Sequence, residues 1–366
     1  MNKKISKIVS LFLCLAMVLG CFPFVAFAAD TTVNTNGNGG KTDVGAWYTT
    51  YNTDAFWGDN GRFSDPSTAK VGYKALRADG SYGVPYSHKV SEIDFQIKKM
   101  AEAGIDFIVF DLTNGGLSQD FNYGTGDNLA FIINNAKLTC ERISAWNDTH
   151  SWKIRYAVSV GVYTNLRLSY VGDKSGLLYT ESIGGKTAAN VGLAAELQAA
   201  EVLNQFVNNE TYGDDYYKLD NKPLLVLHDT GSKLPSSQMA LYFGEKNYLS
   251  QFTVRDSVSK AQKGSYGWYT SGSVADNNNC GAIADDEVML VSPGQCNHGN
   301  GNNTPNASRE NGEHYKANWD AVLANSPRIV MISSLNDYME DTAIWPTVTS
   351  SCVAEEKWQA PYQYWN

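Results

Sequence analysis

Two acidic side chains three positions apart, Asp337 and Glu340, follow an apolar run near the C-terminus, in the stretch MISSLNDYMEDTAIWP (331–346). Two carboxylates in one cleft are the minimum equipment for glycoside hydrolysis: one protonates the leaving oxygen, and the other supplies a base, a nucleophile or negative charge. Alternatively, Asp337 caps the end of a strand and Glu340 begins a helix, where the helix dipole favours an acid. Spacing alone leaves both interpretations open.

A carboxylate pair can act only if the fold holds both groups at one place, and the chain predicts such a fold. Buried parallel strands read as nearly continuous apolar runs that end in polar residues. IDFIVFDLTN (105–114) and KPLLVLHDT (222–230) fit this description. The other candidate strands are DVGAWYTTY (43–51), KIRYAVSVGVY (153–163) and four shorter segments, LSQFTVRD (249–256), GSYGWYTSG (264–272), DEVMLVSPG (286–294) and RIVMISSLND (328–337), which makes eight.

Helices are predicted between some of these strands. The two segments with helical periodicity are SEIDFQIKKMAEAG (91–104) and AAELQAAEVLNQFVNN (194–209). The first places Ile93, Ile97, Met100 and Ala101 on one face and ends at Gly104, where a glycine can adopt the left-handed cap. Helix, glycine and buried strand in succession form the αβ unit of a parallel sheet.

Eight such strands in about 320 residues predict a (β/α)8 TIM barrel, an α/β fold whose active site lies at the C-terminal ends of the strands. The competing fold is a doubly wound open sheet, but no glycine-rich phosphate fingerprint follows the first strand. We expect one barrel domain over residues 43–366, preceded by a flexible polar tether over residues 30–42.

Residues 1–29 read as a secretory signal peptide. They combine a lysine-rich start, a long apolar stretch and an A-x-A exit at residues 26–28. A lipoprotein cleavage box at Cys21 fits less well, because the apolar stretch continues past it. No later segment approaches the roughly 20 apolar residues of a membrane helix. We therefore expect secretion from a bacterial cell, without membrane insertion after cleavage.

Composition narrows the class of partner. The chain of 366 residues carries 29 Lys and Arg against 38 Asp and Glu, for a formal charge of −9, and no basic stripe follows residue 30. A nucleic-acid partner is therefore not expected. Aromatic residues make up 12% of the chain, and such rings either line sugar-binding clefts or fill the core. The sequence does not specify an oligomeric state.

Neither a metal nor a cofactor is expected. The chain has five His and no CxxC or HxxxH pattern, which disfavours a zinc site and a metal-dependent deacetylase. The cysteines outside the signal peptide are Cys140, Cys280, Cys296 and Cys352. Cys280 and Cys296 are the nearest pair, although spacing does not fix the connectivity of disulfides.

Polar and aromatic residues gather at the predicted strand ends and supply further candidates for substrate binding. They are Trp47, Tyr48, Asp111, Asn114, His228, Trp268, Tyr269, Arg309, Asn336 and Tyr338. Asp111 can bind sugar hydroxyls, orient the catalytic pair, or cap a loop with Asn114. His228 is a ligand contact or a structural group. Arg309 pairs with an acid near the mouth of the barrel or forms a surface salt bridge.

The segment Asn336-Asp337-Tyr338-Met339-Glu340-Asp341-Thr342 resembles the motif Asn-Glu-Trp-His-Glu-Gly-Thr that closes the eighth strand in glycoside hydrolase family 99 and its relatives near family 71. Other stretches agree in order and spacing over nearly all of residues 43–350. They are GAWYTTY, AGIDFIVFDLTNGG, NKPLLVLH, and SPG (292–294) followed by Arg309, Gly312, Tyr315 and Trp319.

The resemblance implies roles for both carboxylates. The residue matching Asp337 acts on the sugar's 2-hydroxyl as a base, so that a 1,2-anhydro sugar forms, and the residue matching Glu340 is the general acid and then base. This chain has Asp337 in place of Glu, Tyr338 in place of Trp and Met339 in place of His. The shorter Asp337 side chain leaves open whether it approaches the hydroxyl, a water or the anomeric carbon.

These observations predict a secreted glycoside hydrolase that is endo-acting and retaining on an α-linked polysaccharide of the mannan or glucan type. The alternative is a non-catalytic carbohydrate-binding protein on a degenerate TIM barrel, motivated by the departures at residues 337–339.

Overall fold

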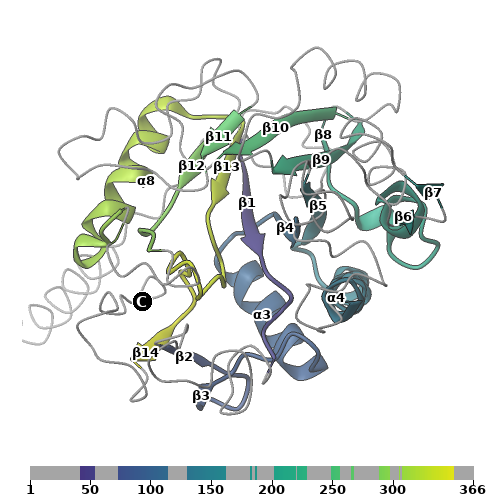
Figure 1. The fold of residues 1–366 in the computed structure, drawn as a ribbon, viewed down its shortest axis with the longest axis horizontal. Helices are drawn as coiled ribbons and strands as arrows, with labels where there is room; N and C mark the ends of the chain where they lie inside the picture. The colour runs from purple at the N-terminus through teal and green to yellow at the C-terminus, as the bar shows by residue number, and fades with distance from the viewer. Residues whose placement is uncertain are drawn as a thin grey trace, which may run out of the picture.

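A computed structural model describes residues 42–53, 73–113, 130–161, 182–183, 186–187, 202–219, 221–228, 249–255, 265–267, 288–296, 305 and 307–349. Its central feature is a curled parallel sheet (Figure 1). The strands of this sheet are β1 (Asp43–Tyr48), β4 (Phe107–Leu112), β5 (Arg155–Gly161), β9 (Lys222–His228), β10 (Leu249–Arg255), β11 (Ser265–Gly267), β12 (Val288–Val291) and β13 (Ile329–Ile332). Each lies within one of the eight predicted segments.

The order of the strands makes the sheet an α/β barrel. Neighbours follow the sequence β11-β10-β9-β5-β4-β1-β13-β12, and every pairing along it is parallel. Strands β1 and β13, the first and last of this sheet along the chain, are therefore neighbours, and β11 and β12, at the two ends of this order, approach each other. The C-terminal ends of all these strands point to one side of the molecule.

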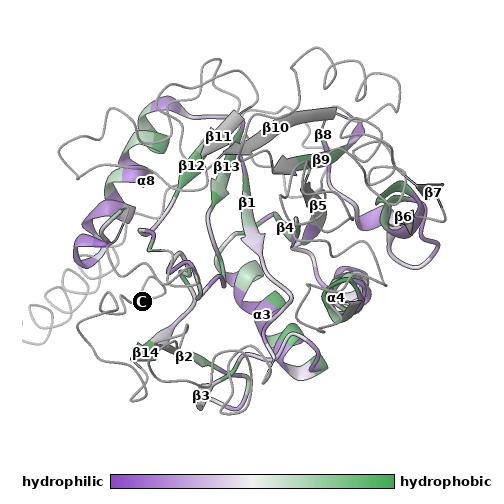
Figure 2. Cartoon of the chain, in the orientation of Figure 1, coloured by the Kyte–Doolittle hydropathy of each residue, from purple (hydrophilic) through white to green (hydrophobic). Residues whose placement is uncertain are grey.

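Within the described ranges, three α-helices lie outside the sheet: α3 (Val90–Glu102), α4 (Ala130–Thr149) and α8 (Glu313–Asn325). The predicted inward face of α3 is confirmed at Ile93, Ile97 and Met100, which are all buried. The predicted glycine cap is confirmed too. Gly104 has a φ of 76°, and the amide of the next residue, Ile105, bonds the Met100 carbonyl at 3.0 Å. Figure 2 shows hydrophobic strands β12 and β13 inside and mixed hydropathy along α3 and α8.

Short elements complete the described structure. They are the hairpin β6 (Ser182–Ile183) and β7 (Lys186–Thr187), the π-helical turn η1 (Leu203–Val207), the 3-10 turns η2 (Gly213–Asp215) and η5 (Glu310–Gly312), β8 (Lys218–Leu219) antiparallel to β9, and the antiparallel sheet β14 (Thr347–Thr349), β2 (Tyr73–Leu76) and β3 (Tyr82–Gly83). Turn η1 lies in the predicted helix 194–209, of which residues 194–201 are outside the described ranges. Among the helices described, none has the length and apolar character needed to cross a membrane.

Large side chains fill the N-terminal half of the barrel. A Cβ on Gly45 would lie 2.4 Å from Phe107 Cζ and 2.6 Å from Met331 Sδ, so only glycine leaves room for both side chains. The Phe107 ring stacks on Tyr217 at 3.9 Å, and the Tyr217 hydroxyl donates to Asp43 Oδ2 at 2.6 Å. This packed base leaves the opposite end of the strands as the place for chemistry, as in other barrels.

Two cysteines bear on the disulfide prediction. Cys140 and Cys296 are buried and are present as thiols, so the possible bridge between Cys296 and Cys280 is not formed. Burial, with a smaller contribution from Asp341, raises the pKa of Cys296 to about 12, which keeps this thiol protonated at neutral pH. Cys280 and Cys352 are outside the described residues.

Candidate active site

The turn that follows β13 is fixed to the end of β1 by Asn336. Its Oδ1 accepts a hydrogen bond from the Thr49 amide at 2.8 Å, and its Nδ2 donates to the Thr49 carbonyl at 3.0 Å. The Leu335 amide also donates to the Trp47 carbonyl at 2.9 Å. Asn336 is 1% exposed. It therefore serves as a clamp between the first and last barrel strands, and its amide is already occupied by backbone.

Asp337 organises this turn with its own side chain. Its Oδ1 accepts hydrogen bonds from the amides of Met339 and Glu340, both at 3.1 Å, which is the capping arrangement expected of an aspartate at a strand end. Residues 338–341 form turns, and no helix begins at Glu340. Asp337 therefore caps the chain after the strand, as the structural interpretation predicts, whereas Glu340 does not begin a helix.

The environment of Asp337 raises the pKa of its carboxyl group. The residue is 4% exposed, and this burial is the main reason that its pKa is raised to about 6. The Tyr51 hydroxyl donates a hydrogen bond that opposes the shift, whereas the charge of Asp111 adds to it. A carboxyl group with a pKa near the working pH can both accept and return a proton.

Tyr51, which the sequence did not single out, is affected by the charges of three carboxylates. Burial raises the pKa of this phenol well above its usual value, and the charges of Asp337 and Asp111, together with Glu340, raise it further. Tyr51 therefore remains a hydrogen-bond donor at any ordinary pH. The only available signal in the sequence was its position in GAWYTTY, four residues after Trp47.

Asp111, at the end of β4, caps a turn with its own side chain. Its Oδ1 accepts from the Thr113 amide at 3.1 Å and from the Thr113 hydroxyl at 2.6 Å, which is a loop-capping turn. It is also close enough to Asp337 and Tyr51 to shift the pKa of both. On the neighbouring strand β5, Ser159 is in register with Asp111, and its buried hydroxyl has no hydrogen-bond partner within the described structure.

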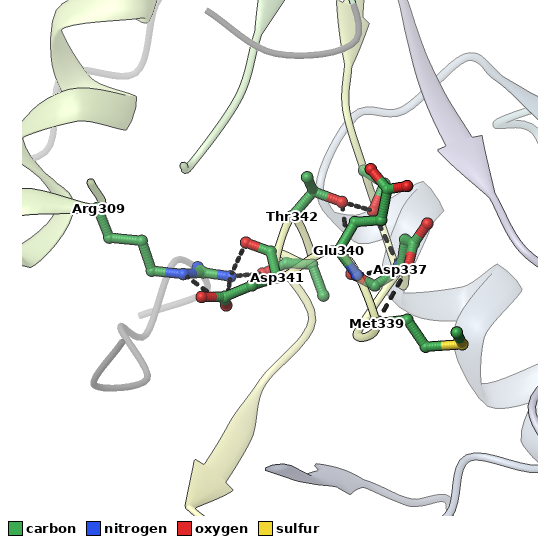
Figure 3. A network of polar contacts seen from close by, with 8 residues as sticks. Arg309, Asp337, Met339, Glu340, Asp341 and Thr342 are labelled. Atoms are coloured by element: carbon green, nitrogen blue, oxygen red, sulfur yellow. Dashed lines mark hydrogen bonds and ion pairs between the residues drawn. The ribbon is translucent and has the colours of Figure 1, made fainter. Parts of the chain in front are cut away.

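Glu340 lies on the same side of the turn as Asp337 and is more exposed. It is half-buried, and its Oε2 accepts a hydrogen bond from Gln295 Nε2 at 3.3 Å. Figure 3 shows the side chains of Asp337 and Glu340 on one side of the turn and Arg309 on the other. The two carboxylates are therefore neighbours at the C-terminal end of the barrel, on the side of the turn away from Arg309.

Arg309 holds the opposite side of the turn. It is 4% exposed, and its Nη2 donates to Asp341 Oδ1 at 2.9 Å and to the Ala343 carbonyl at 3.0 Å. Asp341 is fully buried and has a φ of 52°, in the left-handed region. Arg309 therefore pairs with an acid near the mouth, as one interpretation expected. These contacts support the turn, and the predicted sugar contact of Arg309 stays a prediction.

Three aromatic candidates are core residues. Trp47, Tyr48 and Tyr338 are each 1% exposed. The Tyr48 hydroxyl points outward to α3, where it donates to Gln96 Oε1 at 2.6 Å. Their rings are buried among the described residues, and their part in substrate binding stays a prediction. The alternative that many aromatics are core accounts for them.

The remaining candidates cannot be placed as side chains. His228 is the last residue of β9, a position described for its backbone only. Asn114, Trp268 and Tyr269 lie outside the described residues. Within the part of the chain that is described, no three His, Cys, Asp or Glu side chains come together as a potential metal site.

Comparison with known proteins supports the fold. No protein-family model matches the chain, and no curated protein sequence does. Two solved structures of the GH99 endo-alpha-mannosidase from Bacteroides thetaiotaomicron are similar to it. One, in complex with bis-tris-propane, has a TM-score of 0.52 at 13% identity and covers 88% of this chain and 93% of that one. The other has a TM-score of 0.54 at 14% identity, covering 88% and 94%. At this identity the likeness shows a shared fold.

Proposed function

We propose that this protein is a glycoside hydrolase that cleaves an α-linked polysaccharide of the mannan or glucan type, endo-acting and with retention of configuration. The observation that carries the proposal is the carboxylate pair. Asp337, with a pKa of about 6, and the more exposed Glu340 lie on one side of a single turn at the C-terminal end of the barrel. The fold shared with endo-alpha-mannosidase structures supports the same class.

The proposed first step uses both groups at once. The Asp337 carboxylate removes the proton from the sugar's 2-hydroxyl, and that oxygen attacks the anomeric carbon to form a 1,2-anhydro sugar. The bond from this carbon to the leaving oxygen breaks, and the Glu340 carboxylic acid gives its proton to the leaving oxygen. A base with a pKa near 6 is mostly ionised at pH 7, as this step requires.

In the second step the Glu340 carboxylate takes a proton from water as the water oxygen attacks the anomeric carbon. The bond from this carbon to the 2-oxygen breaks, and that oxygen recovers its proton from Asp337. Two displacements at one carbon restore the original configuration. Tyr51 supports the cycle by donating a hydrogen bond to the charged form of Asp337.

Secretion is part of the same proposal, since a polymeric glycan is met outside the cell. Residues 1–29 act as the signal peptide, and the mature chain begins at Asp30. The glycan is the proposed partner, and neither a metal nor a cofactor takes part.

The test is a reducing-sugar assay of the mature chain on a panel of α-mannans and α-glucans, run beside Glu340→Gln. We expect the wild type to release oligosaccharides from one polymer and the variant to lose at least about a hundredfold in rate, because an amide cannot protonate the leaving oxygen. Glu102→Gln, at an exposed acid on α3, is the matched control and should keep full activity. Equal rates for wild type and Glu340→Gln would contradict the assignment of the acid.

A second candidate function is binding without turnover. It is favoured by one observation, the use of Asp337 Oδ1 in capping its own turn. Retention of the mature chain on an immobilised α-mannan or α-glucan, with no sugar released from any polymer of the panel, would establish this alternative and exclude the hydrolase.

A further inference from the structure

We propose that Gln295 is a positioning residue for Glu340, orienting its carboxylate and stabilising the charged form. The inference depends on the proposed function, in which Glu340 is the acid and base. Its basis is the hydrogen bond from Gln295 Nε2 to Glu340 Oε2 at 3.3 Å. Gln295 is 2% exposed, whereas Glu340 is half-buried. The donor therefore comes from the protein interior to a carboxylate at the site.

The backbone around Gln295 is fixed on both sides. Its amide donates to the Ala307 carbonyl at 2.8 Å, and its carbonyl accepts from the Ala307 amide at 3.1 Å. The next amide, of Cys296, donates to the carbonyl of Glu340 itself at 3.0 Å. The two residues are thus joined through main chain as well as side chain, so the carboxamide has little freedom to move away from the carboxylate.

Gly294 allows this segment to approach the turn. It has a φ of 150°, and a Cβ there would lie 2.8 Å from Arg309 Cγ and 3.0 Å from the Ala307 carbonyl oxygen. Arg309 in turn binds Asp341, the neighbour of Glu340. Gln295 and Arg309 therefore hold adjacent residues of one turn from packed positions, which is how a carboxylate is kept in a productive orientation.

A carboxamide suits both states of an acid that becomes a base. It is uncharged at any working pH and carries donors on nitrogen and an acceptor on oxygen. It can donate to the Glu340 carboxylate, as here, and its oxygen can accept from the carboxylic acid after rotation about the last side-chain bond. A carboxylate at this position would instead repel the ionised form of Glu340.

The experiment uses Gln295→Leu and Gln295→Glu in the mature chain, with Gln96→Leu as the matched control. Gln96 is also a buried glutamine, but its partner is the Tyr48 hydroxyl. Two quantities are measured: the pH profile of kcat and KM on the α-mannan or α-glucan that the wild type cleaves, and the carboxyl titration of Glu340. The titration is followed by NMR in chains labelled with carboxyl-13C glutamate, with the Glu340 signal identified by its absence from Glu340→Gln.

For Gln295→Leu we expect kcat to fall about tenfold with KM within about twofold, because one charge-assisted hydrogen bond is lost while sugar contacts remain. The alkaline limb of the kcat profile and the Glu340 titration midpoint should both rise by about one pH unit. Gln295→Glu should raise the midpoint at least as far. Gln96→Leu should lower the melting temperature without moving the midpoint.

An unchanged Glu340 midpoint in folded Gln295→Leu would overturn the inference, and so would a lowered midpoint in Gln295→Glu. If the leucine variant does not fold, the nearly isosteric Gln295→Glu decides alone. Absence of turnover by the wild type on every polymer would overturn the proposed function, whereas the NMR midpoint still decides the role of Gln295. The two failures are therefore distinguishable.

Discussion

Replacing Asp337 by Asn should stabilise the protein at neutral pH while abolishing its activity. The pKa of Asp337 is raised from 3.8 to about 6, chiefly by burial. A shift of roughly 2 pH units corresponds to about 3 kcal/mol of free energy that folding loses when the group must ionise. The amide has no charge to bury, and its Oδ1 can still accept from the amides of Met339 and Glu340.

The sign of the effect fixes its pH window. The folded-state pKa of Asp337 is higher than its unfolded-state pKa. The protonated carboxyl group therefore contributes its full stabilisation of the wild type below about pH 4, and this stabilisation is lost as the pH rises through about 6. The free energy of unfolding of Asp337→Asn, relative to wild type, should therefore increase by about 3 kcal/mol between pH 4 and pH 8. Loss of turnover should accompany the gain, since an amide cannot act as a base.

Urea unfolding of the mature chain at five pH values from 4 to 8 measures this difference directly. The control is Asp320→Asn on α8, which removes an exposed carboxylate paired with Lys316 at 2.8 Å and should change stability by less than about 1 kcal/mol at each pH. A difference between Asp337→Asn and wild type that stays constant within about 0.5 kcal/mol across the range would refute the reasoning, because burial would then impose no cost on the charge.

Two further predictions concern the base and the N-terminus. Tyr51→Phe removes the hydroxyl that stabilises charged Asp337, so the acidic limb of the kcat/KM profile should move up by about one pH unit. The control is Tyr48→Phe, which removes a hydroxyl that bonds Gln96 and should leave this limb in place. An unmoved limb in Tyr51→Phe would argue against the contact between Tyr51 and Asp337. N-terminal sequencing of the chain from the culture medium should begin at Asp30, and a lipid-modified chain beginning at Cys21 would contradict simple secretion.

Strands β4, β12 and β13 were predictable because a strand buried on both faces has a nearly continuous apolar run, here FIVFDL, VMLV and IVMI. Helix α3 was predictable for a similar reason, its regular buried face and its glycine cap. Helix α4 was missed, although Ile132, Ile133, Ala136, Cys140 and Ile143 are buried along it, since Asn and Thr residues within it have low helix propensity. The sheet of β14, β2 and β3 joins short segments about 270 residues apart, and no local pattern signals such a pairing.

Residues that touch the carboxylate pair were harder to find than the pair itself. Asp337 and Glu340 stand out because two acids follow an apolar run at close spacing. Tyr51 and Gln295 come from other strand ends: Tyr51 is the last residue of GAWYTTY, and Gln295 directly follows SPG. Choosing them over Trp47 and Tyr48 required knowing which side chains face the turn. The alternation of side chains along a strand predicts their direction only within the strand, and the candidate site residues lie just beyond the strand ends.

Asp337, at a position where the family 99 motif has glutamate, shapes the turn with its own side chain. Its Oδ1 reaches two amides at 3.1 Å, a local cap that suits the length of aspartate. At the position where the family 99 motif has glycine, Asp341 adopts a left-handed φ of 52° that glycine would take without strain. Its ion pair with Arg309 supports that conformation here. The differences from that motif at 337 and 341 therefore belong together, because both side chains shape the backbone that carries Glu340.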